Sequence, residues 1–430
     1  MLFREKDFMA DLGLASLEPP VAQVDLPKPE DYLPREEVAA LTPAILRERT
    51  LALKPMIAAK ARETELARRP LPDVWSALAR AGIFYHFVPK RYGGLEFGFE
   101  DMVDIMMPVA EACASTGWAA TFCVEHNYIF SQFPKEAQDE VYAKLPYMIA
   151  PGTASPPGKA RKAPGGLRVS GHWKWGSGIM NSDWVMAQVV IEDGTPMNGM
   201  PDMAFVAFPI EDCTVLDTWH MSGMCGTGSN DFVVNDIFVP EHRVLPSRHF
   251  INCDGPGALS QENIMYRGAM VPFTAVACAI PALGAARAAV DYYRDKSRTR
   301  ILMGTQTKAM DTQAVQIRLG RADMLARTAE LLVRDGCRTM QREVEAGNQF
   351  DSVWRRRVRA QISEGVHLCR DAIVLAMDGS GASAHALDVP IQRYQRDCSV
   401  VVTHALYEPD ANHEAHGRAL LDLAPAGPMF

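Results

Sequence analysis

Two polar side chains stand in surroundings that suit chemistry. Ser177 lies between Gly176 and Gly178, and glycines on both sides of a hydroxyl allow close approach of the backbone to a flat ligand. His404 lies in the otherwise apolar stretch 400–406, and an imidazole can exchange a proton near neutral pH. Plainer interpretations stay open: Ser177 as a turn serine bonded to its own backbone, and His404 as a hydrogen-bonded core histidine.

The sequence offers no metal or nicotinamide motif beside these groups. Its nine cysteines are scattered singly, without a CxxC pair or a Cys/His set at zinc spacing. We therefore expect no metal site, and single thiols without a disulfide framework favour a reducing, cytoplasmic location. There is no GxGxxG string after a strand, so a built-in nicotinamide site is not supported.

The segments that must position these residues differ in their sequence patterns. Residues 1–35 are Pro-rich and irregular, a tail or strap, and residues 36–150 show helical spacing of apolar side chains. Residues 151–256 hold short β-branched or alternating runs separated by Gly and Pro, which predicts a small sheet or barrel. Helical periodicity returns over 257–430, with a long amphipathic stretch at 312–342. Helices, then strands, then long helices favour an α+β fold with segregated layers.

Composition excludes several classes of protein. The chain has 430 residues, 48% hydrophobic and 22% charged, which is typical of a globular protein of two or three domains. A net charge of −8 gives no basic field for nucleic acid or anionic lipid. The longest apolar stretch, Met270 to Ala289, contains two prolines and an arginine, so we expect a buried helix there and no membrane span.

Four strings in the same order resemble the acyl-CoA dehydrogenase superfamily. They span about residues 70–410 and comprise Trp75 to Ile83 with Val88 to Gly94, Gly171 to Gly178 with Asp183-Trp184, Gly223 to Phe232 with Asp236 and Val239-Pro240, and Pro390 to Arg393 with Arg396-Asp397. The resemblance implies an N-terminal helical domain, a central β-barrel or sheet domain that contacts flavin through a β-hairpin, and a C-terminal four-helix bundle that also forms the oligomer interface.

Two further strings are similar to the oxygenase components of two-component (group D) aromatic monooxygenases, such as p-hydroxyphenylacetate hydroxylase and dibenzothiophene monooxygenase. The first is Thr116-Gly117-Trp118 with Glu125-His126-Asn127, and the second is Thr403 to Leu406. Acyl-CoA dehydrogenases carry a catalytic glutamate in this last zone, where His404 or Ala405 falls here. Glu408 follows too late by about three residues.

The resemblance assigns roles to the candidate catalytic residues. It places the Ser177 hydroxyl near flavin N5 and makes His404 the catalytic base or the group that stabilises a peroxide formed on the flavin ring. His126 is a third catalytic candidate and Asn127 a substrate contact, although both also suit buried structural residues. Trp118 is a candidate wall of the substrate site and Trp175 of the flavin site; packing in the core is the alternative for both.

Further residues are implied as flavin contacts. Thr153 and Ser155 precede Pro156-Pro157 at the start of the β region, where loop residues are the alternative. Arg298 and Arg300 fall where a neighbouring subunit contacts the flavin phosphate, and a guanidinium fork suits that group. Gly379 and Ser380 form a glycine turn whose backbone N–H groups could cradle phosphate.

The resemblance implies an oxygenase component that uses O2 and reduced FMN or FAD, supplied by a separate NAD(P)H:flavin reductase, to oxygenate a small aromatic or heteroaromatic molecule. The family implies a homotetramer. Three alternatives stay open: an acyl-CoA dehydrogenase or oxidase with Glu408 as base, a nitroalkane-oxidase-like enzyme, and a non-catalytic relative of the fold.

Overall fold

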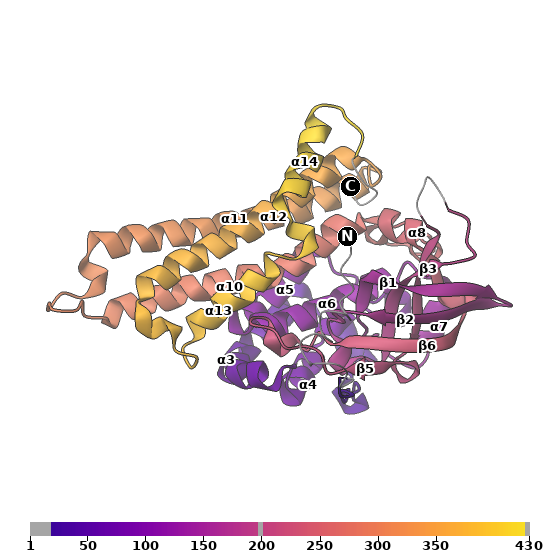
Figure 1. Cartoon of the computed structure of the whole chain (residues 1–430), viewed down its shortest axis with the longest axis horizontal. Helices are drawn as coiled ribbons and strands as arrows, with labels where there is room; N and C mark the ends of the chain where they lie inside the picture. The colour runs from indigo at the N-terminus through magenta and orange to yellow at the C-terminus, as the bar shows by residue number, and fades with distance from the viewer. Residues whose placement is uncertain (1–18, 197–200, 426–430) are drawn as a thin grey trace, which may run out of the picture.

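The computed structural model describes residues 19–196 and 201–425, and it confirms the predicted α+β architecture of helices, then strands, then long helices. An N-terminal group of helices and a central sheet lie side by side, and long C-terminal helices extend away from them to one side (Figure 1). The three regions are coloured in sequence order from indigo to yellow in that view.

Helix α6 (Ala114–Phe130) is the centre of the N-terminal group, and each of its 17 residues is buried. The other helices around it are α2 (Arg35–Ala39), α3 (Pro43–Ala67), α4 (Pro72–Ala81), α5 (Phe99–Ala112) and α7 (Lys135–Tyr142). The sequence Leu71-Pro72-Asp73 predicts a helix start, and α4 begins there, because proline fixes the backbone at a position where no amide hydrogen bond is lost. The stretch from Phe99 to Ala114 predicts another helix, which is α5.

The central sheet has seven strands in the order β5-β6-β2-β1-β3-β4-β7, and only β1 and β3 pair in parallel. The strands are β1 (Gly152–Ala163), β2 (Gly166–Trp173), β3 (Trp184–Ile191), β4 (Met203–Pro209), β5 (Thr214–Leu216), β6 (Asp231–Pro240) and β7 (Val244–Pro246). The alternating or β-branched runs 167–169, 184–191, 204–208 and 232–239 predict four strands, and they fall in β2, β3, β4 and β6. Strand β1 was missed because Pro156-Pro157 indicates a loop; the structure accommodates the prolines at a register shift between Thr153 and Gly158.

The expected flavin-contacting hairpin at Gly171 to Gly178 is not a hairpin. Strand β2 ends at Trp173 and pairs with β1 and β6, whereas the following strand, β3, pairs with β1 and β4. The residues between β2 and β3 therefore form a crossing turn at the end of the sheet, closed by the short 3-10 helix Ile179–Asn181. This turn carries Ser177.

The C-terminal region is built on a four-helix bundle of α10 (Met270–Thr299), α11 (Gln313–Glu345), α12 (Ser352–Ser380) and α13 (Pro390–Val401). Three shorter helices flank it: α8 (Ser247–Asn252), α9 (Pro256–Leu259) and α14 (Pro409–Leu420). Among the described residues, α10 alone is long and apolar enough to cross a membrane, but 83% of its most apolar window is buried, as expected for a core helix.

The Pro-rich N-terminal segment packs on its own chain where it is described. Val21 bridges Leu216 at the edge of the sheet, and Asp25 and Asp31 form ion pairs with Arg69 and Arg80. Residues 1–18 of this predicted tail lie outside the described residues.

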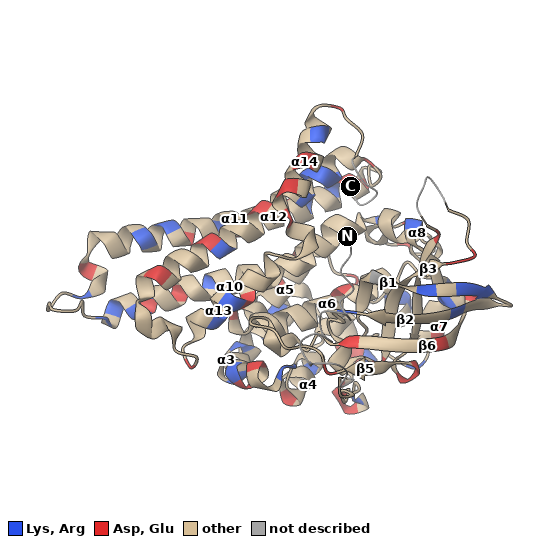
Figure 2. Cartoon of the chain, in the orientation of Figure 1, with Lys and Arg blue, Asp and Glu red and all other residues tan. Residues whose placement is uncertain are grey.

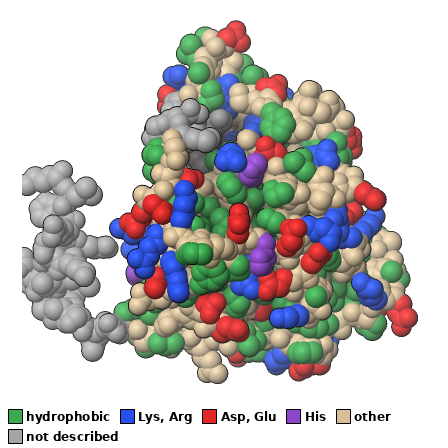
Figure 3. Space-filling view, turned by 90° about the vertical axis from the view of Figure 1, so that its right-hand side faces the viewer, with side chains coloured by type: hydrophobic (Ala, Val, Ile, Leu, Met, Phe, Trp, Pro, Cys, Tyr) green, Lys and Arg blue, Asp and Glu red, His purple; other side chains and the backbone are tan. Residues whose placement is uncertain are grey.

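Charges of both signs are interspersed on the surface (Figures 2 and 3). The most visible basic group lies on β1 and β2 (Figure 2), where Lys159 pairs with Glu192, and Arg161 and Arg168 share Asp236. The basic side chains of this hairpin are thus largely neutralised by their neighbours.

Candidate active site

The turn after β2 brings the Ser177 hydroxyl against helix α6. Trp118, which is 8% exposed, donates its indole N–H to Ser177 Oγ at 2.9 Å. A Cβ on Gly178 would lie 2.6 Å from Cys123 Sγ, so the turn reaches α6 this closely only with glycine at that position. Two predicted site residues, Ser177 and Trp118, thus contact each other within a single chain.

Three aromatic side chains one turn apart on α6 form one wall of this place. The ring centroids of Trp118 and Phe122 are 4.8 Å apart, and those of Phe122 and His126 are 5.3 Å apart. His404, beyond the end of α13, meets Trp118 edge-on with centroids 5.8 Å apart. Residues far apart in the sequence thus meet where the sheet, α6 and the bundle join; we call Ser177, Trp118, His126 and His404 the junction site.

His404 is held as a neutral imidazole with a defined tautomer. Burial lowers its pKa from 6.5 to about 4. Its Nδ1 accepts the backbone N–H of Leu406 at 3.3 Å, so the ring proton resides on Nε2. No described residue hydrogen-bonds Nε2, which leaves an N–H donor free at the junction site. This arrangement suits the predicted stabilising role of His404 better than the role of a base.

His126 has the opposite tautomer. Its Nδ1 is hydrogen-bonded to the carbonyl of Ala150, which can only accept, so the proton resides on Nδ1 and Nε2 is an acceptor. Burial lowers the pKa of this imidazole to about 4. A Cβ on Gly152 would lie 2.9 Å from Nε2, so glycine at the start of β1 leaves room for the ring.

Glu125 was not predicted as a functional residue, although it lies beside His126. Its Oε2 is buried, has no hydrogen-bond partner among the described residues, and lies 3.8 Å from His126 Nε2. Its Oε1 accepts the hydroxyl of Thr274 at 2.6 Å. Burial raises the pKa of this carboxyl to about 7 against the opposing effect of Thr274. An acid in an otherwise uncharged helix was the signal that could have found it.

The predicted flavin contacts of the β region lie in two settings. Thr153 is buried next to the Gly152–His126 contact, and its hydroxyl has no partner among the described residues. Ser155 lies on the exposed side of β1, inside a strand and not in the expected loop. Trp175 is 58% exposed and has a left-handed backbone with φ of 61° beside Ser177.

These observations fit a flavin ring at the turn. The Trp175 indole is a large apolar surface without an apolar cover in the chain, and a left-handed backbone at a non-glycine residue is characteristic of functional positions. The buried hydroxyl of Thr153 lacks a partner that a polar ring edge would provide. The half-buried Ser177 hydroxyl contacts Trp118 and Ser229, and an oxygen with these two partners can still accept one further hydrogen bond.

Asn127 has no polar atom left for a substrate. Its amide donates to the carbonyls of Cys123 and Met148, each at 3.0 Å, and its oxygen accepts Met148 N–H and the Tyr142 hydroxyl. All its hydrogen-bonding capacity is thereby used in tying α6 to the segment before β1. The polar contact predicted for Asn127 finds no free group there.

The remaining predicted flavin contacts lie at the far end of the bundle (Figure 1), where α10 and α12 end. Arg298 is exposed and pairs with Asp295 at 3.5 Å, while Arg300 donates to the carbonyl of Gly379 at 2.9 Å. Gly379 and Ser380 belong to the last turn of α12 and not to a loop, and the Ser380 hydroxyl bonds the Ala376 carbonyl of that helix. Helix α13, about 18 Å long, runs between this cluster and His404.

Glu408, the base of the alternative dehydrogenase mechanism, has a structural role here. Its carboxylate is exposed and caps α14 by accepting the backbone N–H groups of Asp410 and Ala411. It therefore does not face the junction site in this structure, whereas His404 does.

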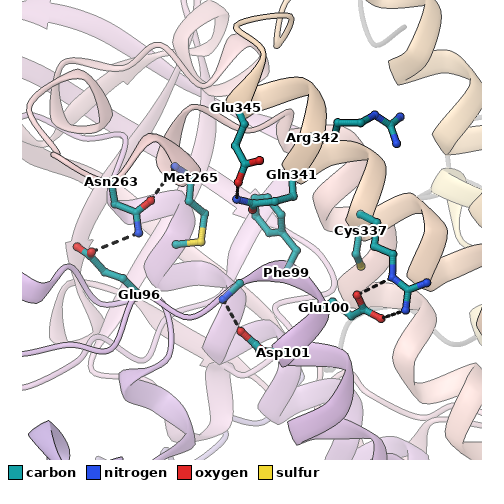
Figure 4. Close-up of a pocket in the computed structure, with 12 residues that line it drawn as sticks. Glu96, Phe99, Glu100, Asp101, Asn263, Met265, Cys337, Gln341, Arg342 and Glu345 are labelled. Atoms are coloured by element: carbon teal, nitrogen blue, oxygen red, sulfur yellow. Dashed lines mark hydrogen bonds and ion pairs between the residues drawn. The ribbon is translucent and has the colours of Figure 1, made fainter. Parts of the chain in front are cut away.

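A groove of about 390 Å³ lies elsewhere, between the start of α5 and the second half of α11 (Figure 4). Its charged side chains already have partners: Glu100 pairs with Arg338, Asp101 accepts the N–H of Gly98, and Glu345 accepts the amide of Gln341. The groove contains none of the predicted site residues, and no unpartnered polar atom points to a ligand.

Comparison with known proteins shows the family of the chain. Residues 49–149 match the family "Acyl-CoA dehydrogenase, N-terminal domain" and residues 276–409 match "Acyl-CoA dehydrogenase, C-terminal domain". The chain is 36% identical to a pigment production hydroxylase of a Rhodococcus species, over 91% of this chain and 100% of that protein. It is 30% identical to the oxygenase component of the FADH2-dependent resorcinol hydroxylase of a Rhizobium species, over 88% and 94%. The solved structure of XiaF from a Streptomyces species in complex with FADH2 and glycerol has a TM-score of 0.84 and 30% identity, over 92% of this chain and 99% of that one.

Proposed function

Because this chain belongs to the acyl-CoA dehydrogenase superfamily and, within it, to the oxygenase components of two-component flavin-dependent monooxygenases, we propose that it hydroxylates a small aromatic molecule with reduced flavin and O2. One observation carries the proposal. A neutral, half-buried imidazole, His404, faces Trp118 beside Ser177, in the zone where a dehydrogenase requires a carboxylate.

The bound flavin would supply the electrons that activate oxygen, and the chain supplies the surroundings. The turn at Ser177 would meet the N5 edge of the ring, with Trp175 against the ring and Thr153 at a polar edge. FAD is the proposed flavin, since both a 30% identical relative and a 30% identical structure carry FADH2 in their names. The buried Trp118 and Phe122 rings would keep water away from a flavin bound at this turn.

The two histidines would have opposite hydrogen-bonding roles, His404 as a donor and His126 as an acceptor. His404 presents an N–H at Nε2, which can hold a negatively polarised oxygen in place. His126 presents an unprotonated Nε2, which can accept a hydrogen bond from a substrate hydroxyl, with Glu125 behind it as a second proton acceptor. A phenol fits this pair better than an aromatic ring without a hydroxyl group.

Arg298 and Arg300 lie too far along the bundle to serve the junction site of their own chain, so we propose that they contact the flavin phosphates of a neighbouring subunit in a homotetramer. The reduced flavin would come from a separate NAD(P)H:flavin reductase, as the name "oxygenase component" of the relative implies for that protein. We expect a cytoplasmic location, where single thiols stay reduced; all nine cysteines are free.

Rapid mixing tests the proposal directly. The purified chain is loaded with reduced FAD without oxygen and mixed with oxygenated buffer. We expect a transient near-ultraviolet absorbance band, distinct from oxidised flavin, followed by slow return of the oxidised spectrum. Featureless reoxidation at the rate of free flavin would contradict the proposal, and bleaching of bound FAD by acyl-CoA thioesters would then be examined.

A further inference from the structure

The Ser177 hydroxyl is one end of a chain of hydroxyl groups that runs into the protein. Ser177 Oγ and Ser229 Oγ are 3.0 Å apart, and Ser229 Oγ is 2.9 Å from Thr227 Oγ1. Thr227 Oγ1 lies 3.0 Å from the carbonyl oxygen of Met224. Ser229 and Thr227 are each only 1% exposed, so water cannot substitute for these partners.

The far end of this chain is fixed. The Met224 N–H donates to buried Asp397 of α13 at 2.6 Å, and the Met224 carbonyl accepts the indole N–H of Trp219 at 2.9 Å. The Met224 backbone is left-handed, with φ of 53°. These contacts hold the carbonyl toward Thr227, and a carbonyl can only accept a hydrogen bond.

Counting protons from that carbonyl fixes the direction of every bond. Thr227 has one hydroxyl proton and donates it to Met224, so Thr227 Oγ1 accepts from Ser229. The proton of Ser229 is then committed to Thr227, and the bond between the two serines is donated by Ser177. Ser177 also accepts the Trp118 N–H, so one lone pair is all that it can offer to a ligand.

We infer that Thr227 and Ser229 make Ser177 a hydrogen-bond acceptor and thereby set the site to prefer reduced over oxidised flavin. The inference rests on the proposed function, in which Ser177 faces N5. Reduced flavin carries a hydrogen on N5 and can donate it to the free lone pair of Ser177. Oxidised flavin has only a lone pair on N5, and binds Ser177 well only if the serine gives up its bond to Ser229.

This difference has an expected size. Giving up one buried hydrogen bond weakens binding of the oxidised form by about tenfold. For a two-electron couple, a tenfold preference for the reduced form raises the midpoint potential of the bound flavin by about 30 mV. Selecting the reduced form would let the oxygenase release spent flavin to its reductase.

Anaerobic binding of dithionite-reduced FAD, compared with aerobic binding of oxidised FAD, tests the inference in the full-length protein. In Thr227→Val the proton of Ser229 is released and can turn toward Ser177, whose own proton then faces N5. We expect oxidised FAD to bind about tenfold more tightly and reduced FAD more weakly than in the wild type. Thr227→Ser keeps the hydroxyl and is the matched control, expected to reproduce the wild-type ratio.

A second variant protects the test against a folding defect at Thr227. Ser229→Ala frees the proton of Ser177 without adding a donor, so oxidised FAD should gain about tenfold while reduced FAD stays unchanged. If both variants melt near the wild-type temperature and keep the wild-type ratio of the two dissociation constants, the inference is wrong. If the wild type binds neither form of FAD, the proposed function itself fails.

Discussion

The junction site and the far end of the bundle were both predicted to bind flavin, yet they differ in construction. At the junction site, His404, Ser177 and Trp118 come from three regions of one chain and meet in a largely buried place. At the bundle end, Arg298 pairs with Asp295 of its own helix and Arg300 donates to the Gly379 carbonyl of α12, at a more exposed surface.

The difference fits the proposal that the junction site handles protons, whereas the bundle end holds the flavin phosphates. Groups that handle protons need fixed tautomers and little water, and the junction site provides both within one subunit. A phosphate contact needs only a mobile guanidinium at a surface that another copy can reach. We therefore expect changes at the junction site to alter turnover or pH dependence, and changes at the bundle end to alter flavin affinity.

The largest effect is expected from His404→Ala. This change removes the free N–H donor at the junction site, so product formation should fall by about 1,000-fold while the affinity for reduced FAD stays within about twofold. Product is measured by chromatography under single turnover, with a phenol of the resorcinol type as first substrate, and hydrogen peroxide is measured in parallel.

His413→Ala is the matched control, because His413 lies at the surface of α14 and pairs only with Glu364 at 3.7 Å. It should turn over like the wild type. Unchanged product formation in His404→Ala would remove His404 from the mechanism, and loss of FAD binding in that variant would reassign it as a structural residue.

The next effect concerns Glu125 and the dryness of the junction site. The pKa of its carboxyl rises from 4.5 to about 7 on folding because the group is buried. The protonated form is therefore favoured in the native state, and its contribution to stability is present below pH 4.5 and lost as the pH rises to 7. Relative to Glu125→Gln, the wild type should lose about 3 kcal/mol of unfolding free energy over that range.

Urea unfolding at several pH values between 4.5 and 8 measures this difference. Glu364→Gln, at an exposed carboxylate, is the matched control for the substitution itself. If the unfolding free energy of Glu125→Gln changes with pH in the same way as that of the wild type, water reaches Glu125. The two regions then do not differ in their exposure to water. At the exposed bundle end the pH dependence has the opposite sign. Arg294 lowers the pKa of the Asp295 carboxyl, so the stability that this carboxylate contributes is lost as the pH falls.

The fold was largely predictable because its signals are local. Helical spacing around residue 75 and at 312–342, and β-branched runs in β3 and β4, are set by which face of each element is buried. Strand β1 was not predictable, since its prolines favour a loop and only the neighbouring strands hold it extended. Gly379 and Ser380 were misassigned to a loop for the converse reason: α12 continues through Gly379 despite its low helix propensity.

The site was predictable in part. Ser177 and His404 carry local signals, glycines and an apolar context, and the structure brings both against Trp118. The roles of Thr227 and Ser229 depend on which way each hydroxyl proton points, and that follows from contacts across 52 residues and from a carbonyl fixed by α13. No spacing in the sequence encodes a hydrogen-bond direction.

The smallest effect is expected at the bundle end, and it tests whether that end serves another subunit. Arg300→Gln removes a charged donor, so the dissociation constant for reduced FAD should rise about tenfold while single turnover at saturating FAD stays unchanged. Arg327→Gln, at an exposed arginine paired with Asp323 on α11, is the control and should bind FAD like the wild type.

Co-expression of Arg300→Gln and His404→Ala chains with different tags then decides the arrangement. If Arg300 acts across subunits, mixed oligomers contain sites with an intact His404 from one chain and an intact Arg300 from the other. Random pairing would give such sites at about one quarter of the wild-type number, with wild-type affinity for FAD. If every site that turns over binds FAD as weakly as Arg300→Gln does, Arg300 acts within its own chain, and the proposal that the bundle end serves a neighbouring subunit is wrong.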